Sequence, residues 1–209
     1  LARHRAGARI GHDTAYDSMF LDGLEDAYEP GRLMGSFAEE TGRAYQFTRQ
    51  MMDDYAVRSL TKAKAAVESG AFTREITPVE VVGRKGAVLV TEDEQPSKAD
   101  PAKIPTLKPA FARDGAITAA NASSISDGAA ALVMTRESVA RKLGMTVVAR
   151  VAAHAAHAQE PGQFATAPVP AIRKVLERAG WNTADVDLFE VNEAFAVVAM
   201  VDQRDLGID

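Results

Sequence analysis

The sequence predicts an α/β protein with a layered sheet, interrupted by a helical and irregular insertion. From Gly115 onward, short apolar runs of strand length alternate with helical segments, which is typical of a sheet covered by helices. Roughly the first 110 residues instead contain helical patterns and a stretch rich in proline. We therefore expect the first part of the chain to be the insertion and the rest to be the α/β body.

The first seventy residues are expected to be helical. Residues 16–27 and 49–69 both place apolar side chains at spacings of three and four. Thr48 is a suitable N-cap for the second helix, and Gly70 is a suitable residue to end it. The Met and Tyr side chains along that helix are interpreted as core packing.

A hairpin and a loop are expected next. Residues 76–82 and 87–91 have the composition of strands, and the Gly-containing sequence 83–86 between them predicts a short turn. Residues 92–109 include four prolines and many charges. This stretch is expected to be neither helix nor strand.

The body is expected to alternate strands and helices. The predicted strands are 147–153 and 186–191. The predicted helices are 136–143, capped by Thr135 and ended by Gly144; 168–179, ended by Gly180; and one that follows Asn192 through about residue 204.

Composition excludes several classes of function for these residues. The chain has 209 residues, 24 basic and 29 acidic, so its net charge of −5 gives no general attraction for nucleic acid. Its lack of cysteine excludes disulfides, zinc–thiolate sites and thiol nucleophiles from this sequence. It has no apolar run long enough for a transmembrane helix, and its basic start lacks the apolar segment of a signal peptide. We expect a cytoplasmic protein whose two ends are cut rather than natural.

Two apparent motifs are interpreted as structural. Ser59 and Lys62 have the spacing of an acyl-transfer motif, but the sequences that accompany that motif are missing. His154 and His157 lie three apart without enough carboxylates nearby for a metal site. We therefore expect no metal.

Three other features leave two interpretations open. Arg84 and Lys85 at the hairpin tip serve solubility or contact a phosphate. The small residues of 121–131 pack tightly against a neighbour or form a smooth groove for a thin ligand such as a pantetheine arm. Asn192 follows a predicted strand, so it is either a helix N-cap or a ligand-contacting group.

Taken in order, seven short stretches resemble those of the biosynthetic-type thiolases. They are 16–24 (YDSMFLDGL), 33–35 (LMG), 83–86 (GRKG), 107–111 (LKPAF), 118–123 (TAANAS), 126–130 (SDGAA) and 192–195 (NEAF). The resemblance implies a five-layered αβαβα core, present here in part, with an inserted loop domain. It divides the chain into the loop domain (1–122), the end of the N-terminal half (123–155) and the start of the C-terminal half (156–209). It also implies a dimer or tetramer, with residues 5–17 contributing to tetramer assembly.

The resemblance further assigns roles to individual residues. Asn192 is expected to anchor a catalytic water in an oxyanion hole. The residues expected to bind the acyl-CoA are Ser123, Ala119 and Ala122 at the pantetheine arm, Phe111, Phe195 and Met34 along the tunnel, and Lys98, Arg84 and Lys85 near the nucleotide. Coenzyme A thioesters are expected as substrates, with no separate cofactor.

The chain departs from the family pattern at a few positions. Leu33 stands where the family often has His, and Ala120 stands where it has Gly. Lys98 is the basic residue nearest to the place of an Arg that helps to hold the nucleotide; a lysine cannot form the bidentate contact of an arginine.

The resemblance places the family's nucleophilic Cys upstream of Leu1, and its second Cys and catalytic His downstream of Asp209. The 209 residues alone are therefore expected to be inactive. The first hypothesis is that they form part of an acetyl-CoA C-acetyltransferase, which makes or cleaves acetoacetyl-CoA through an acyl-Cys intermediate. The alternative is a non-catalytic CoA-binding or scaffold protein that needs a partner chain.

Overall fold

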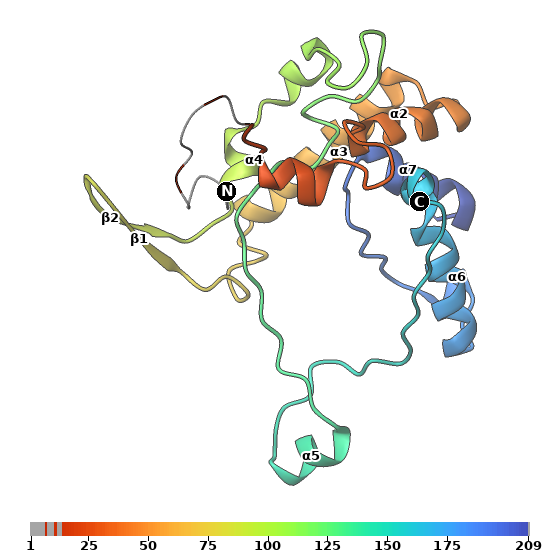
Figure 1. The fold of residues 1–209 in the computed structure, drawn as a ribbon. Helices are drawn as coiled ribbons and strands as arrows, with labels where there is room; N and C mark the ends of the chain where they lie inside the picture. The colour runs from red at the N-terminus through yellow and green to blue at the C-terminus, as the bar shows by residue number, and fades with distance from the viewer. Residues whose placement is uncertain (1–6, 8–10, 12–13, 209) are drawn as a thin grey trace.

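The computed structural model describes Gly7, Gly11 and residues 14–208. Figure 1 shows helices gathered at one end, a projecting hairpin, and a short helix carried on two long extended segments. The elements in chain order are η1 (Phe20–Leu24, a π-helical turn), α2 (Met34–Ala44), α3 (Arg49–Glu68), β1 (Val79–Gly83), β2 (Gly86–Val90), α4 (Glu94–Lys98), η2 (Pro101–Thr106), α5 (Glu137–Lys142), η3 (Pro161–Thr166), α6 (Pro168–Ala179), η4 (Thr183–Asp185) and α7 (Ala196–Leu206).

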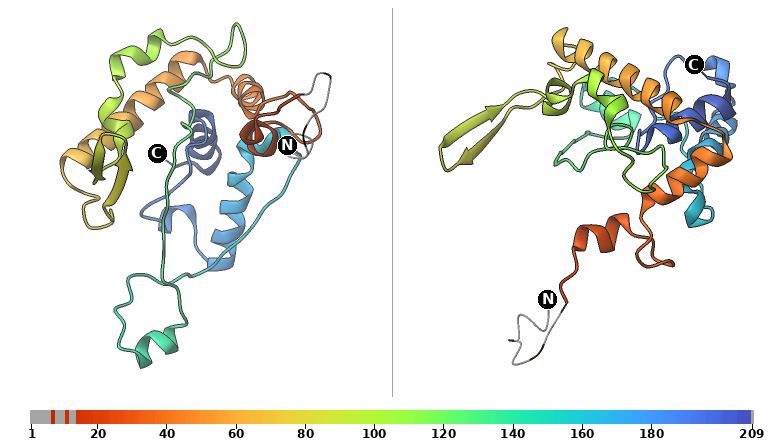
Figure 2. Two further views of the ribbon diagram at one scale, coloured as in Figure 1. Left: turned by 60° about the vertical axis from the view of Figure 1, so that its left-hand side comes forward. Right: turned by 90° about the horizontal axis from the view of Figure 1, so that it is seen from above.

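The core is built around α7. Every residue of this helix from Ala196 to Asp202 is buried, and the helix contacts α2, α3, α6 and η3. Met52 of α3 and Ile117 of the loop after η2 are fully buried in the same hydrophobic cluster. Figure 2 shows α7 beside these helices in both views. The core therefore joins helices that are far apart in the sequence.

A glycine allows the loop after η2 to approach α2 closely. A Cβ atom at Gly35 would lie 2.2 Å from the ring of Phe111. Any larger residue would displace this ring, which also packs edge-to-face with Phe195 at 6.2 Å between centroids. Gly35 of α2 therefore leaves room for an aromatic contact between the loop after η2 and the start of α7.

The predicted hairpin is confirmed. β1 and β2 are antiparallel, with Val79 opposite Val90 and Gly83 opposite Gly86. Arg84 and Lys85 form the two-residue connection at its tip, which the positive φ of Gly86 completes. The hairpin projects from the helices in Figures 1 and 2. Its predicted basic tip is therefore an exposed feature of the fold.

The predicted ends of two helices are also confirmed. The Thr48 hydroxyl accepts a hydrogen bond from the Met51 amide at 3.2 Å, as an N-cap does. Gly70 and Gly180 follow α3 and α6 in the left-handed conformation, which glycine adopts without a steric penalty.

Two predictions about helices were wrong, one about the length of a helix and one about its N-cap. The helix expected at 16–27 is reduced to the short turn around η1, which contains no buried residue to stabilise a longer helix. Thr135 does not cap α5, because that helix begins one residue later, with Arg136 as its N-cap.

The proline-rich stretch 92–109 was also predicted incorrectly, because it contains α4 and η2. The Asp93 and Asp100 side chains accept hydrogen bonds from the Gln95 and Ala102 amides, each at 3.0 Å. These carboxylates cap the two short helices, and proline is compatible with the first turn of a helix.

The strands predicted at 147–153 and 186–191 are not formed. Within the described residues, the one sheet is the β1–β2 pair, and both of these segments are extended without a ladder partner. Val148 is 97% exposed and Leu188 is 74% exposed. Strand-like sequences form a strand only when another strand supplies the opposite hydrogen bonds, and no such partner lies beside them here.

Two further points concern the chain as a whole. The segment 5–17, expected to contribute to tetramer assembly, lies largely outside the described residues, so that expectation stays a prediction.

Among the helices that the structure describes, none has both the length and the apolar character needed to cross a bilayer.

Asp202 is an unusual member of the core. It is 1% exposed, and neither carboxylate oxygen has a hydrogen-bond partner among the residues that the structure describes. Burial, followed by repulsion from Asp205, raises the pKa of Asp202 to about 6. Folding therefore favours the protonated carboxyl. The contribution of protonated Asp202 to the free energy of unfolding is fully present below about pH 4. It is lost as the pH rises through about 6.

We expect Asp202→Asn to remove this pH dependence. For the unsubstituted chain, the free energy of unfolding should fall by about 1–3 kcal/mol from this group between about pH 4 and pH 7. The measurement is denaturant unfolding of the 209-residue chain across this range. Asp187→Asn, at an exposed position, is the matched control. An unchanged pH slope in Asp202→Asn would contradict the assignment.

Candidate functional site

A cleft of about 1040 Å³ lies between α3, the base of the hairpin and the turn before α7. One wall is the α3 face that carries Tyr55 and Ser59. The opposite side is formed by the small-residue segment 120–129 and by Asn192 and Glu193. Glu92, Asp93 and Glu94 also line the cleft. The cleft therefore brings together segments that are far apart in the sequence.

The floor of the cleft is made by hydrogen bonds between two loops. The Ser123 amide donates to the Ala194 carbonyl at 2.9 Å, and the Ala196 amide donates to the Asn121 carbonyl at 2.8 Å. An isolated antiparallel bridge between Ala122 and Phe195 lies between these bonds. The Ser123 hydroxyl also donates to the Glu193 carbonyl at 2.6 Å. These contacts fix Ser123 next to the turn that carries Asn192.

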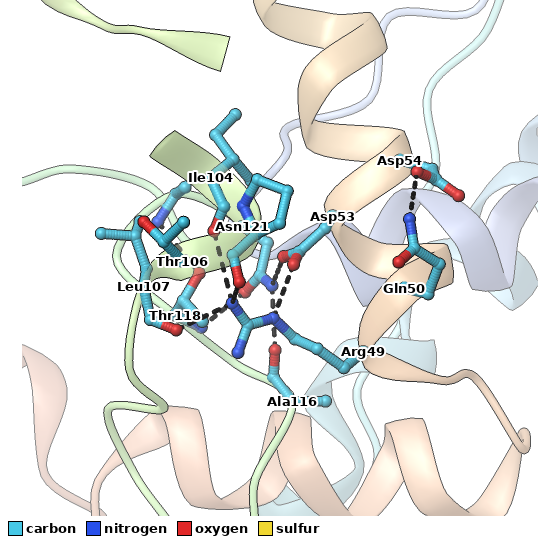
Figure 3. A network of polar contacts seen from close by, with 12 residues as sticks. Arg49, Gln50, Asp53, Asp54, Ile104, Thr106, Leu107, Ala116, Thr118 and Asn121 are labelled. Atoms are coloured by element: carbon cyan, nitrogen blue, oxygen red, sulfur yellow. Dashed lines mark hydrogen bonds and ion pairs between the residues drawn. The ribbon is translucent and has the colours of Figure 1, made fainter. Parts of the chain in front are cut away.

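A polar network behind the floor holds it against α3 (Figure 3). The Arg49 Nε lies 2.7 Å from Asp53 Oδ2, one helical turn along α3. The Arg49 Nη2 donates to the carbonyls of Leu107 at 2.8 Å and Ile104 at 3.3 Å. Asp53 is only 3% exposed, so the carboxylate end of this pair is shielded from water.

Asn121 connects this ion pair to the loop. Its Nδ2 donates to Asp53 Oδ1 at 3.2 Å and to the Ala116 carbonyl at 2.9 Å. Its Oδ1 accepts from the Thr118 amide at 2.7 Å (Figure 3). The side chain is buried and uses both donors and its acceptor, so the path of the loop is tightly determined.

A second buried carboxylate holds the same loop from α2. Glu39 is 4% exposed and accepts hydrogen bonds from the amides of Ala116 and Ile117 at 2.9 and 2.8 Å. A Cβ atom at Gly115 would lie 2.2 Å from this carboxylate. Gly115 therefore leaves the room that Glu39 needs to reach the backbone.

The turn at Asn192 is attached to α3 by its neighbour. The Glu193 carboxylate accepts from the Tyr55 hydroxyl and from the Ser59 hydroxyl, both at 2.8 Å. Burial, together with the hydrogen bond to Glu193, raises the pKa of Tyr55, so its hydroxyl remains a donor. The Asn192 carboxamide itself is exposed and forms no hydrogen bond with any residue that the structure describes.

The structure does not bring all of the predicted site residues to the cleft. Asn192, Ser123 and Ala122 line the cleft, whereas Ala119 is exposed outside its lining. Phe195 belongs to the core beneath it, and Phe111 and Met34 pack against that core.

The three predicted basic residues lie away from the cleft lining. The Lys98 Nζ is 2.7 Å from Glu94 Oε2 and lowers the pKa of that carboxyl. Arg84 and Lys85 are exposed at the hairpin tip. Lys98 is thus already paired, which leaves the hairpin tip as the more available positive charge.

Sequence reasoning missed the groups that hold the site together. Tyr55 packs against the core as predicted, but its hydroxyl also contacts Glu193, as does that of Ser59, whose motif match was given no role. The only available signal was that Tyr55 and Ser59 are one helical turn apart and therefore share a face. The long-range pairing of that face with Glu193 depends on the fold.

His157 was expected to be structural, and the structure places it in a small polar cluster. Its Nε2 is 2.9 Å from Gln159 Oε1 and its Nδ1 is 2.9 Å from Lys174 Nζ. Across the described ranges, no group of three or more acidic or histidine side chains is arranged to hold a metal ion.

Comparison with known proteins defines the class to which this fold and cleft belong. Residues 1–138 match the family described as thiolase, N-terminal domain, and residues 145–209 match thiolase, C-terminal domain. The chain belongs to the thiolase family.

Individual relatives agree with this family. The chain is 49% identical to acetyl-CoA acetyltransferase 2 of Arabidopsis thaliana and 44% identical to the acetyl-CoA acetyltransferase of Escherichia coli, over 100% of its own length. It covers 52% and 53% of those proteins, so it spans about half of their length. The crystal structure of the Bacillus anthracis acetyl-CoA acetyltransferase matches it with a TM-score of 0.92 at 38% identity, covering 100% of this chain and 53% of that one. This likeness confirms the predicted fold class, a partial thiolase α/β fold.

We expect Asn121→Ala to destabilise the chain by about 2–4 kcal/mol, because it leaves Asp53 and the Thr118 amide buried with fewer partners. The measurement is the free energy of unfolding in denaturant. Asn192→Ala is the matched control, since it removes the same carboxamide from an exposed position without hydrogen bonds. Equal stability of the two variants would contradict the role given to Asn121.

Proposed function

We propose that the complete protein is an acetyl-CoA C-acetyltransferase that makes or cleaves acetoacetyl-CoA, and that this chain supplies much of its CoA-binding cleft. The observation that carries the proposal is the meeting of Asn192 and Ser123 on one hydrogen-bonded cleft floor. The names of the relatives support the same reaction class.

Asn192 is suited to the stabilisation of a thioester oxygen. Its carboxamide is exposed at the cleft, and its two N–H donors are not engaged by other described residues. Carbon–carbon bond formation between acetyl groups passes through an enolate, whose oxygen needs hydrogen-bond donors. A preorganised donor, acting directly or through a water, lowers that barrier.

Ser123 and its small neighbours are suited to a pantetheine arm. The Ser123 hydroxyl donates to the Glu193 carbonyl, so its oxygen can still accept a hydrogen bond from an amide N–H of the arm. Ala122, Gly128 and Ala129 line the cleft and leave room for a narrow ligand. Its volume of about 1040 Å³ is close to the upper end of that of small-molecule sites.

The nucleotide phosphates are proposed to lie toward the hairpin tip. The cleft lining includes Glu92, Asp93 and Glu94, which repel an anionic group. Arg84 and Lys85 are the exposed basic side chains on the hairpin. No cofactor is proposed besides the coenzyme A thioesters that act as substrates.

The covalent chemistry is proposed to come from other parts of the complete protein. The 209 residues contain no cysteine, so they cannot supply the acyl-Cys intermediate. In this proposal the acetyl group of one acetyl-CoA is transferred to a cysteine thiolate, which displaces CoA. A general base outside these residues then removes a proton from the α-carbon of a second acetyl-CoA, and this carbon takes the acetyl group and displaces the cysteine thiolate. A cytoplasmic homo-oligomer stays a prediction from the family resemblance.

In the complete protein, Asn192→Ala should lower kcat for acetoacetyl-CoA formation by about 10²–10³, because one donor to the enolate oxygen is lost. The assay is steady-state turnover with acetyl-CoA, together with the Kd of CoA by calorimetry. Asn182→Ala, at an exposed position, is the control and should retain kcat.

The two arms of the assay distinguish the alternatives. Unchanged turnover in Asn192→Ala would contradict the role of this residue. A complete protein that binds CoA but transfers no acetyl group would instead support the non-catalytic scaffold hypothesis.

A further inference from the structure

Glu193 lies at the crossing of three segments. Its carboxylate contacts α3: Oε1 accepts a hydrogen bond from the Tyr55 hydroxyl and Oε2 accepts one from the Ser59 hydroxyl. Its backbone carbonyl accepts from the Ser123 hydroxyl at 2.6 Å. One residue therefore connects the long helix, the small-residue loop and the turn of Asn192.

The α3 end of this connection is rigid. Met52, Asp53 and Ala56 bury the adjoining part of the helix surface in the core. The ion pair of Arg49 with Asp53 further attaches the helix to the loop at 104–107. Tyr55 and Ser59 thus present two hydroxyls from a fixed support.

The Asn192 end has no comparable support of its own. Its side chain has no hydrogen bond within the described part of the chain, and its carbonyl accepts only from the Ala194 amide at 2.9 Å, inside the same turn. The direction of the Asn192 carboxamide is therefore set by how the turn is held. Glu193, the next residue, holds it to α3.

We propose that Glu193 is a positioning residue that fixes the Asn192 turn by accepting hydrogen bonds from Tyr55 and Ser59. We call these three residues the Glu193 clamp. The expected effect of the clamp on turnover rests on the proposed function. The expected effect of the clamp on the order of the Asn192 turn is independent of that function. A pair of charge-assisted hydrogen bonds is stronger and more directional than neutral ones, which suits a positioning role.

The first test removes the clamp without touching Asn192. In the complete protein, Tyr55→Phe with Ser59→Ala should lower kcat by about 10-fold to 100-fold, the size expected when a catalytic group is misplaced. The Kd of CoA should change by no more than about twofold, since Ser123 and its backbone bonds remain. Tyr28→Phe with Ser69→Ala removes the same hydroxyls at exposed positions and should leave kcat unchanged.

A double-mutant cycle separates positioning from general structural damage. If the clamp acts through Asn192, adding the clamp substitutions to Asn192→Ala should cause no further loss of kcat. Glu193→Gln, which retains a carbonyl acceptor, should lose less activity than Glu193→Ala. The same fold-loss in both backgrounds, or no loss beside the native Asn192, would overturn the proposal.

A second readout does not depend on activity. Backbone hydrogen exchange in a peptide covering 192–195 should become at least about tenfold faster in the clamp variant, because the turn opens more often. Unchanged exchange would overturn the clamp whatever the turnover. If exchange rises while the complete protein transfers no acetyl group, the clamp stands and the proposed function fails.

Discussion

The cleft depends on the buried contact of Arg49, Asp53 and Asn121. The Arg49–Asp53 ion pair itself lies within α3, one turn apart, and Arg49 also donates to the loop carbonyls of Ile104 and Leu107. Asn121 adds a tertiary contact by joining Asp53 to the Thr118 amide and the Ala116 carbonyl. Because the Asn121 backbone also accepts from the first residue of α7, the same contact sets the start of the central helix.

Two buried aspartates show why partners matter more than burial. Asp53 has Arg49 and Asn121 beside it; removing Arg49 would leave its charge shielded from water and uncompensated, and removing Asn121 would take a hydrogen bond from its Oδ1. Asp202 is also buried but has no hydrogen-bond partner in the described part of the chain, and its pKa rises instead. The first carboxylate organises the cleft floor. The second weakens the helix that lies beneath it, in a way that protonation relieves.

Whether a feature of the fold or of the cleft could be predicted depends on how far apart in the sequence its interacting residues lie. The helix of Thr48 and the hairpin around Arg84 depend on neighbours in sequence, and both were predicted correctly. The strands at 147–153 and 186–191 depend on distant partners, which apolar patterning alone cannot supply. Asn192 and Ser123 were singled out by family resemblance and do meet at one cleft. The role of Glu193 could not be anticipated, because its two donors lie on a helix more than a hundred residues earlier.

The same distinction explains why the cleft is well formed although the apolar segments on either side of α5 are exposed. Its floor and walls need only α3, α7 and two loops, whose contacts are hydrogen bonds and packing within this chain. The extended segments take part in none of these contacts except where they leave the cleft near Gly128. Under the proposed function, ligand binding and covalent chemistry are thus carried by separate stretches of sequence. The Asn192 turn is the point where they must meet, and it is also the point that the fold attaches most directly to α3.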